Sequence, residues 1–397
     1  MIRSIFVERY KKVLIAACLL VIGVGVFNAV IQNNQWKEVY NDPNAKASFE
    51  ENRNEITYWD EEKEENVPYA SYQEYRNSQL LFYTSYLPYS KSLRASDYSS
   101  DTSYQSHFTT YFNSALLLLV PLIGFLLFFI DQKTGFNQFL FSLGASRKEL
   151  FKKKIIYLAI PVLLSILVGQ SLYALLIHSL IPAPYMNATL GQLFTSVISN
   201  FSLLFFLFCS SAFIGSMVGN IFFGPLTLAV FLLLRSWLPN SIYSLVDNIK
   251  LARGTINKPF SRTLFVDFVG KMGGSIWANV ILVLLGLFLM FWAYKKYQSL
   301  SLENDNAYLL HKESRWSIWW LMTLFTSFIL NLNVFDPWSN FLIRKIFEHV
   351  NESIIGPILV NVSVTLTVGC ICAIVVFFSG ITRKAAKTFD KLNHRTG

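Results

Sequence analysis

The chain has 397 residues, of which 53% are hydrophobic and only 15% are charged, whereas soluble domains carry about a quarter charged residues. This composition excludes an ordinary soluble enzyme, because so apolar a chain needs an apolar solvent as well as a core. The net charge of +9 does not indicate nucleic-acid binding, which requires the basic residues on one soluble surface.

Long apolar runs dominate the sequence, and an uncharged run of about 18 or more residues is typical of a helix that crosses a bilayer. The runs predict an all-α polytopic membrane protein with eight spans, at 13–31, 112–130, 155–177, 193–218, 221–238, 274–294, 316–334 and 354–379. Because 193–238 is too long for one crossing, we predict a tight hairpin at Gly219-Asn220, near Pro225.

The distribution of Lys and Arg predicts that both termini are cytoplasmic. Four short segments hold 19 of the 34 basic residues: 1–12, 131–154, 295–315 and 380–397. The opposite segments hold only 14, although they are longer in total: 32–111, 178–192, 239–273 and 335–353. The positive-inside rule therefore predicts a multi-pass protein of the cell membrane, in contact with lipid. Segment 239–273 fits this rule least, because it carries five basic residues.

The segment 32–111 is expected to be an extracellular, acidic, tyrosine-rich domain. It holds 13 acidic residues and 11 of the 19 tyrosines, and it contains no cysteine. Tyr69, Tyr72 and Tyr75 recur every three residues, which on a helix makes an aromatic stripe. Two interpretations stay open for this stripe: packing against the outer ends of the spans, or a surface that receives a ligand.

The spans contain little that indicates chemistry. Apart from Arg235, no Asp, Glu, Lys, Arg or His lies in the apolar part of a span, whereas ion-coupled carriers bury such groups. The sequence has no HExxH, GxSxG or GKS/GKT motif, so we expect no catalysis, cofactor or metal site in this chain. Ser211, Gly215 and Gly219, spaced by four, predict a strip of small residues for close helix contact.

The segment 131–154 carries the most informative pattern. Phe136, Phe139, Leu140 and Leu143 follow the spacing i, i+3, i+4, i+7, which predicts a helix with one apolar stripe. Gly144 is suited to a helix C-terminus. The next residues, Ser146, Arg147, Lys148 and Glu149, form a capping box that predicts the start of a second helix leading into the third span. An amphipathic helix resting on lipid is the alternative interpretation.

This segment resembles the membrane subunits of type-2 ABC transporters. In that family an acidic residue and a glycine precede an amphipathic coupling helix, and a small turn and a Ser-Arg-Lys/Arg-Glu-like step follow it. The matching residues are Asp131, Gly135, Leu140, Ser142, Gly144, Ser146, Arg147, Lys148 and Glu149. The resemblance covers about 131–155, and the span order over 13–294 is that of a six-span core. The long segment 32–111 and the added spans in 316–379 depart from minimal members.

The resemblance implies a permease subunit of an ATP-driven exporter. Its coupling segment, 136–149, is expected to bind a separate cytoplasmic ATPase subunit that holds ATP and Mg, and a second permease copy or homologue is expected beside it. Uncharged spans favour an amphipathic or apolar substrate such as a peptide, an antimicrobial or a lipid. The disulfide-free outer segment favours a Gram-positive bacterium. Two alternatives are a membrane sensor or scaffold with a ligand-binding extracellular domain, and an ion-coupled secondary transporter.

The predicted organisation has eight parts. These are the N-terminus with the first span (1–31), the extracellular domain (32–111), the second span (112–130), the coupling loop (131–154), spans three to six (155–294), a cytoplasmic loop (295–315), spans seven and eight (316–379) and a basic cytoplasmic tail (380–397).

Overall fold

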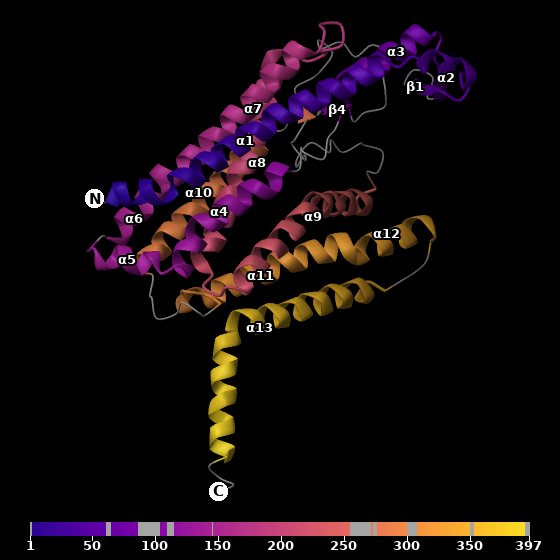
Figure 1. Cartoon of the computed structure of the whole chain (residues 1–397). Coiled ribbons are helices and arrows are strands. Elements are labelled where there is room, and N and C mark those ends of the chain that lie inside the picture. The colour runs from indigo at the N-terminus through magenta and orange to yellow at the C-terminus, as the bar shows by residue number, and fades with distance from the viewer. Residues whose placement is uncertain are drawn as a thin grey trace. The chain divides into compact units, whose positions relative to one another are not determined.

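The computed structural model describes residues 2–60, 65–85, 104–108, 115–144, 146–254, 271–272, 276–299, 308–349 and 353–393. The described residues are mostly helical, and eight helices are long and apolar enough to cross a membrane (Figure 1). This confirms the helical class of the chain, and the eight candidate spans agree in number with the prediction.

The elements follow in chain order. They are α1 (Ile2–Tyr40), α2 (Ala45–Glu51), β1 (Thr57–Asp60), β2 (Glu65–Pro68), α3 (Tyr72–Leu80), β3 (Tyr83–Ser85), β4 (Tyr104–Ser106), α4 (Ala115–Lys133), α5 (Phe136–Ser142), α6 (Arg147–Lys154), the π-helix η3 (Ile155–Ala159), α7 (Ile160–Leu180), α8 (Leu190–Met217), α9 (Phe223–Ala252), β5 (Lys271–Met272), α10 (Ile276–Gln298), the 3₁₀ turn η5 (Lys312–Ser314), α11 (Arg315–Ile329), the π-helix η6 (Leu330–Val334), α12 (Pro337–Phe347) and α13 (Ile355–Asn393).

The hairpin predicted at Gly219-Asn220 is present. α8 ends at Met217 and α9 begins at Phe223. The side-chain oxygen of Asn220 accepts from the backbone N–H groups of Phe222 (2.9 Å) and Phe223 (3.1 Å), so it satisfies two donors at the start of α9. The apolar stretch 193–238 is therefore two helices.

Three predicted loops or tails contain helix instead. α9 continues through Pro239 to Ala252, so the first part of the loop expected over 239–273 is helical. Residues 255–270 lie outside the described part of the chain. The segment 335–353 contains α12, and the backbone of α13 stays helical to Asn393, within the expected tail. The extension of α9 has a physical cause in its contacts with α12, given below.

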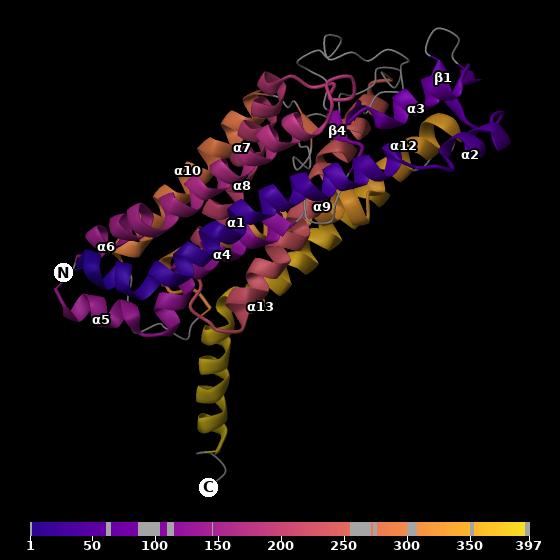
Figure 2. The ribbon, with the colours of Figure 1, turned by 45° about the horizontal axis from the view of Figure 1, so that its top comes forward.

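The chain forms two compact units, each built from three stretches of sequence. Unit 1 comprises Met1–Gly124, Lys152–Ser210 and Ser261–Leu289, and unit 2 comprises Phe125–Phe151, Ser211–Phe260 and Met290–Gly397. In unit 1, α1 and α7 run side by side (Figures 1 and 2). They cross at two glycines: a Cβ on Gly25 would lie 2.3 Å from the carbonyl oxygen of Gly169. Small residues let two backbones approach this closely.

A small subdomain of unit 1 follows α1 and consists of α2, the antiparallel hairpin β1–β2, and α3. Its core holds Phe49, Tyr58 and Tyr69, with Tyr72 and Tyr75 packed against them. The predicted tyrosine stripe therefore packs mainly against α2 and the hairpin. The indole N–H of Trp36 and the carbonyl of Leu80, 2.9 Å apart, tie α1 to the end of α3.

In unit 2, α9, α11, α12 and α13 pack together. The side chain of Asp336 accepts from the Ser244 hydroxyl (2.5 Å), the Asn248 amide (3.0 Å) and the backbone N–H of Ser339 (3.4 Å). We call this contact the Asp336 clamp. It explains why α9 remains helical beyond Pro239, because the polar groups on its last turns have partners on α12 and its N-cap.

Unit 2 also contains a short backbone pairing between the turn after α8 and the residues before α11. Gly219 N–H donates to the Tyr308 carbonyl (2.9 Å), and Leu310 N–H donates to the Met217 carbonyl (3.0 Å). Tyr308 is buried, and its hydroxyl lies 3.1 Å from that of Thr227 in α9. We call this pairing the 217–219/308–310 strap. It joins two segments that the charge distribution predicts to be cytoplasmic.

Candidate functional site

The predicted amphipathic helix of segment 131–154 is α5, and a glycine stands at each of its ends. Gly135, the N-cap, has φ +66°, and Gly144, two residues beyond the last helical residue, has φ +74°. Both values lie in the left-handed region, which glycine adopts without the steric cost that a Cβ brings. The two glycines allow the chain to reverse sharply on either side of a helix of only seven residues.

The second predicted helix, α6, begins at Arg147. The backbone N–H of Glu149 donates to the hydroxyl oxygen of Ser146 at 3.2 Å, which confirms Ser146 as its cap. The side chains of Lys148 and Glu149 are exposed. The helix runs on without interruption, so Arg147–Leu180 is one of the eight candidate spans. We refer to α5, the turn and the start of α6 as the corner.

The apolar stripe of α5 is divided between two environments. Phe136 and Leu140 are buried, and Leu140 is 0% exposed. Phe139 and Leu143 face outward, with 50% and 37% of their surfaces exposed. Leu140 was expected to contact a partner protein, and in this structure the chain itself covers that side chain. Phe139 and Leu143 are the stripe residues that α5 offers to another molecule.

Two hydrogen bonds hold the corner to the end of α10. The hydroxyl of Tyr297 donates to the side-chain oxygen of Asn137 (3.1 Å), and both residues are buried. The guanidinium of Arg147 donates to the carbonyl of Gln298 (3.2 Å) and also lies 5.2 Å from the ring centre of Phe141. One bond comes from α5 and the other from α6, so the corner is fixed to α10 on both sides of its turn.

An aromatic cluster continues this connection into two further helices. Phe128 of α4, Phe151 of α6 and Tyr297 of α10 have ring centres 5.2 to 6.0 Å apart, and Tyr294 lies 5.4 Å from Phe151. Such aromatic pairs are worth about 0.5–1.5 kcal/mol beyond the area they bury. The corner, α4 and α10 are thus joined by contacts between large, stiff side chains.

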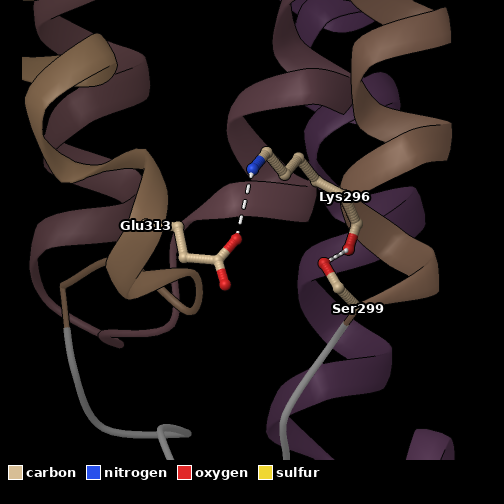
Figure 3. A network of polar contacts seen from close by, with 3 residues as sticks. All are labelled: Lys296, Ser299 and Glu313. Carbon is tan, nitrogen blue, oxygen red and sulfur yellow. Dashed lines mark hydrogen bonds and ion pairs between the residues drawn. The ribbon is translucent and has the colours of Figure 1, made fainter.

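The end of α10 also approaches the segment before α11. The ammonium of Lys296 lies 3.9 Å from the carboxylate of Glu313, and the Ser299 hydroxyl donates to the Lys296 carbonyl at 3.1 Å (Figure 3). His311, nearby in sequence, is buried; burial and the Lys296 charge lower its pKa to about 4, with Glu313 acting in the opposite direction. His311 is therefore neutral near pH 7.

The predicted strip of small residues is confirmed in part. A Cβ on Gly215 would lie 2.3 Å from the carbonyl oxygen of Phe125 in α4, so this glycine marks a close helix crossing. Ser211, one turn earlier, is fully buried. Gly219 does not belong to the strip, because α8 ends at Met217 and Gly219 takes part in the strap with Tyr308.

The sequence interpretation missed the residues that anchor the corner. Asn137, Tyr297 and Gln298 were not predicted to have a role. One signal was available, since Asn137 follows an apolar residue of the stripe directly and a polar side chain there needs a partner if the helix is covered. Its partner Tyr297 is 160 residues away in sequence, which no local pattern indicates.

Comparisons with known proteins assign no family to the chain: no family model, no curated protein and no solved structure matches it. Within the described part of the chain, no group of three or more His, Cys, Asp or Glu side chains is arranged to hold a metal ion. The corner is therefore the feature of the chain that points to a function.

Proposed function

We propose that this chain is the membrane permease subunit of an ATP-driven exporter, and that the corner is its contact with a separate cytoplasmic ATPase. The observation that carries the proposal is the divided stripe of α5. One face of the helix is buried and hydrogen-bonded to α10, and the other presents Phe139 and Leu143. An exposed aromatic and an exposed leucine on a firmly held helix suit insertion into an apolar groove of a protein.

The contacts of the corner give a route by which movement of the ATPase would reach the spans. A displacement of α5 acts on α10 through Asn137–Tyr297 and through Arg147–Gln298. It acts on α4 through the ring contact of Phe128 with Phe151. Because packed aromatic rings make much of this contact, and close-packed side chains transmit strain, a displacement of α5 would be passed on to the spans.

In this proposal, the energy source and the second half of the transport path belong to partners. The sequence has no phosphate-binding loop, so ATP and Mg would be bound by the ATPase subunit. A second permease copy or homologue would complete the path. The first six spans would form the core, segment 32–111 would face the outside, and the last two spans would be an addition. The substrate would be an amphipathic or apolar molecule, since the spans carry almost no ionisable groups.

The proposal is tested with Phe139→Asp and Leu143→Asp in the full-length chain, purified from its native membrane at matched expression. Placing a carboxylate in a desolvated contact costs several kcal/mol, so we expect recovery of the ATPase to fall at least tenfold with either variant. The control is Phe222→Asp, because Phe222 is 81% exposed in the turn before α9 and has no part in the corner. Its recovery of the ATPase should match that of the native chain.

Unchanged recovery with both corner variants, combined with weaker membrane association of the chain, would instead support a helix resting on lipid. Failure of any ATPase to copurify with the native chain would reject the permease function and favour the sensor or scaffold alternative. A photo-crosslinking residue at position 139 provides an independent check, since it should yield a product with the ATPase that the same residue at position 222 does not.

A further inference from the structure

Exposed tryptophans mark the level at which the last span of unit 2 ends. The ring of Trp316, the second residue of α11, lies 5.2 Å from that of Phe377 in α13. The indole N–H of Trp319 donates to the carbonyl of Gly369 at 2.9 Å and joins the same two helices. Trp316 and Trp320 leave 64% and 52% of their surfaces exposed, which is typical of tryptophans in the headgroup region of a bilayer. The chain after Phe377 is therefore expected to leave the membrane at the level of the headgroups.

The backbone of α13 stays helical beyond this level. The apolar run of the eighth predicted span ends at 379, whereas the helix runs to Asn393. We call 380–393 the tail helix. α13 bends along its length (Figures 1 and 2), and Ser379-Gly380 is a pair of the kind at which helices bend. A bend at this pair would allow the tail helix to lie along the membrane surface.

The sequence of the tail helix separates apolar from basic residues. Four apolar residues with the spacing i, i+4, i+8, i+11 fall within roughly 80° of the helix circumference, namely Ile381, Ala385, Phe389 and Leu392. Four basic residues fall within roughly 100° on the other side, namely Arg383, Lys384, Lys387 and Lys391. With Asp390 as the one acidic residue, four positive charges and one negative charge give +3. This pattern is typical of a basic amphipathic helix that lies in a membrane interface.

The position and the charge of the tail helix favour one kind of surface. The distribution of Lys and Arg predicts that this end of the chain is cytoplasmic, and the cytoplasmic leaflet carries anionic lipids. Because the tail helix is tethered to the end of a span, lipid is present beside it at high effective concentration, and a protein would have to compete with that lipid. An anionic bilayer matches both sides of the helix, since its phosphates attract the basic residues and its acyl chains accept the apolar ones.

We propose that the tail helix binds anionic phospholipid on the cytoplasmic leaflet, with its apolar residues toward the acyl chains and its basic residues at the headgroups. This binding holds the end of α13 at the membrane surface. It acts on α11 as well, through the contacts of Trp316 with Phe377 and of Trp319 with Gly369. The position of the last two spans thereby responds to the lipid composition. The inference goes beyond the proposed function and does not depend on an ATPase partner.

The test measures the depth of the tail helix in the purified full-length chain, in lipid nanodiscs and without a partner. The native cysteines are replaced by alanine, and a fluorescent label is attached at Phe389→Cys on the apolar side or at Asp390→Cys on the other side. Nitroxide-labelled phosphatidylcholine quenches a label that enters the bilayer. In nanodiscs that contain phosphatidylglycerol, we expect quenching at 389 to be at least threefold stronger than at 390. In nanodiscs of phosphatidylcholine alone, this ratio should fall toward one.

Two triple variants test the role of charge. Replacing Lys384, Lys387 and Lys391 together by Gln should lower the ratio at least twofold in anionic nanodiscs, whereas replacing the same three by Arg is the matched control and should preserve it. A ratio that is equal in anionic and neutral nanodiscs, or that the Gln variant leaves unchanged, would overturn the inference. Weak and equal quenching at both positions would also overturn it, in favour of a helix that projects into water as an arm for a protein partner.

Discussion

The corner of unit 2 and the spans of unit 1 use their polar and apolar side chains differently. The corner leaves Phe139 and Leu143 exposed and is itself held by hydrogen bonds within the chain. The spans of unit 1 bury uncharged polar side chains and pair them between helices, as in the hydrogen bond of 2.6 Å from Tyr173 in α7 to Gln32 in α1. The difference indicates what each region does. In the proposed function the corner would bind an apolar protein surface, whereas the polar pairs of unit 1 join its helices to one another.

The largest loss of stability is expected from a charge on the buried face of α5. Leu140→Asp places a carboxylate at a fully buried position and should lower stability by roughly 3–5 kcal/mol. Phe139→Asp, one residue earlier on the exposed face, should change stability by less than about 0.5 kcal/mol. Thermal unfolding in detergent separates them. Equal losses from the two variants would mean that the exposed and buried faces of α5 are not distinct.

In unit 1, the hydrogen bond between Tyr173 and Gln32 depends on the crossing of α1 and α7, which Gly25→Ala should disturb. Its new Cβ would lie 2.3 Å from a backbone oxygen, so the helices must move apart, at a cost of about 1–3 kcal/mol. Gly23→Ala is a matched control two residues away, because no atom lies within 4 Å of its added Cβ. It should be neutral or slightly stabilising, since alanine favours helix over glycine. Melting temperatures of the pair, measured at the same detergent concentration, test this directly.

A double-mutant cycle between Asn137 and Tyr297 measures how strongly this hydrogen bond holds the corner to α10. Tyr297→Phe removes the donor to a buried oxygen and should cost about 1–3 kcal/mol. Adding Asn137→Leu removes the oxygen as well and should restore part of the loss, because no buried acceptor is then left unpaired. Chemical unfolding of the four proteins gives the coupling energy. A cycle with no coupling would show that this bond does not hold the corner to α10.

The last effect concerns His311 and is absent at neutral pH, so pH is the variable. Its folded pKa of about 4 lies below the ordinary value of 6.5, so between these values the unfolded chain binds more protons. Stability should therefore be complete above pH 6.5 and fall as the pH drops toward 4. His311→Gln should reduce this dependence. Melting temperatures from pH 7 to pH 4.5 provide the measurement, and an identical slope in both proteins would contradict the assignment.

Local signals in the sequence predicted much of the fold. Long apolar runs gave the eight spans, Gly219-Asn220 gave the hairpin, and the capping box gave the start of α6 at Arg147. Each of these depends on residues that are neighbours in the chain. The extension of α9 to Ala252 was missed, because it depends on Asp336, 92 residues after Ser244.

The contacts between helices could not be predicted from local patterns, because their partners are far apart in the sequence. Gln32 and Tyr173 are 141 residues apart, and Asn137 and Tyr297 are 160 apart. A single asparagine or glutamine near the end of an apolar run is compatible with the interface, with a helix contact or with a ligand site. Only the pairing of side chains from different helices separates these cases. The division of the α5 stripe was equally hidden, because its spacing is the same whether one half or all of it is covered.

The strap and the Asp336 clamp secure α9 near its two ends. Near its start, Thr227 contacts Tyr308 of the strap, and near its end Ser244 and Asn248 bind Asp336. The last two spans are thus joined to α9 by contacts that do not require the covalent link between α10 and α11. If the chain were produced as two separate polypeptides, one ending after α10 and one beginning at Tyr308, the shorter fragment would carry its own docking elements for the longer one.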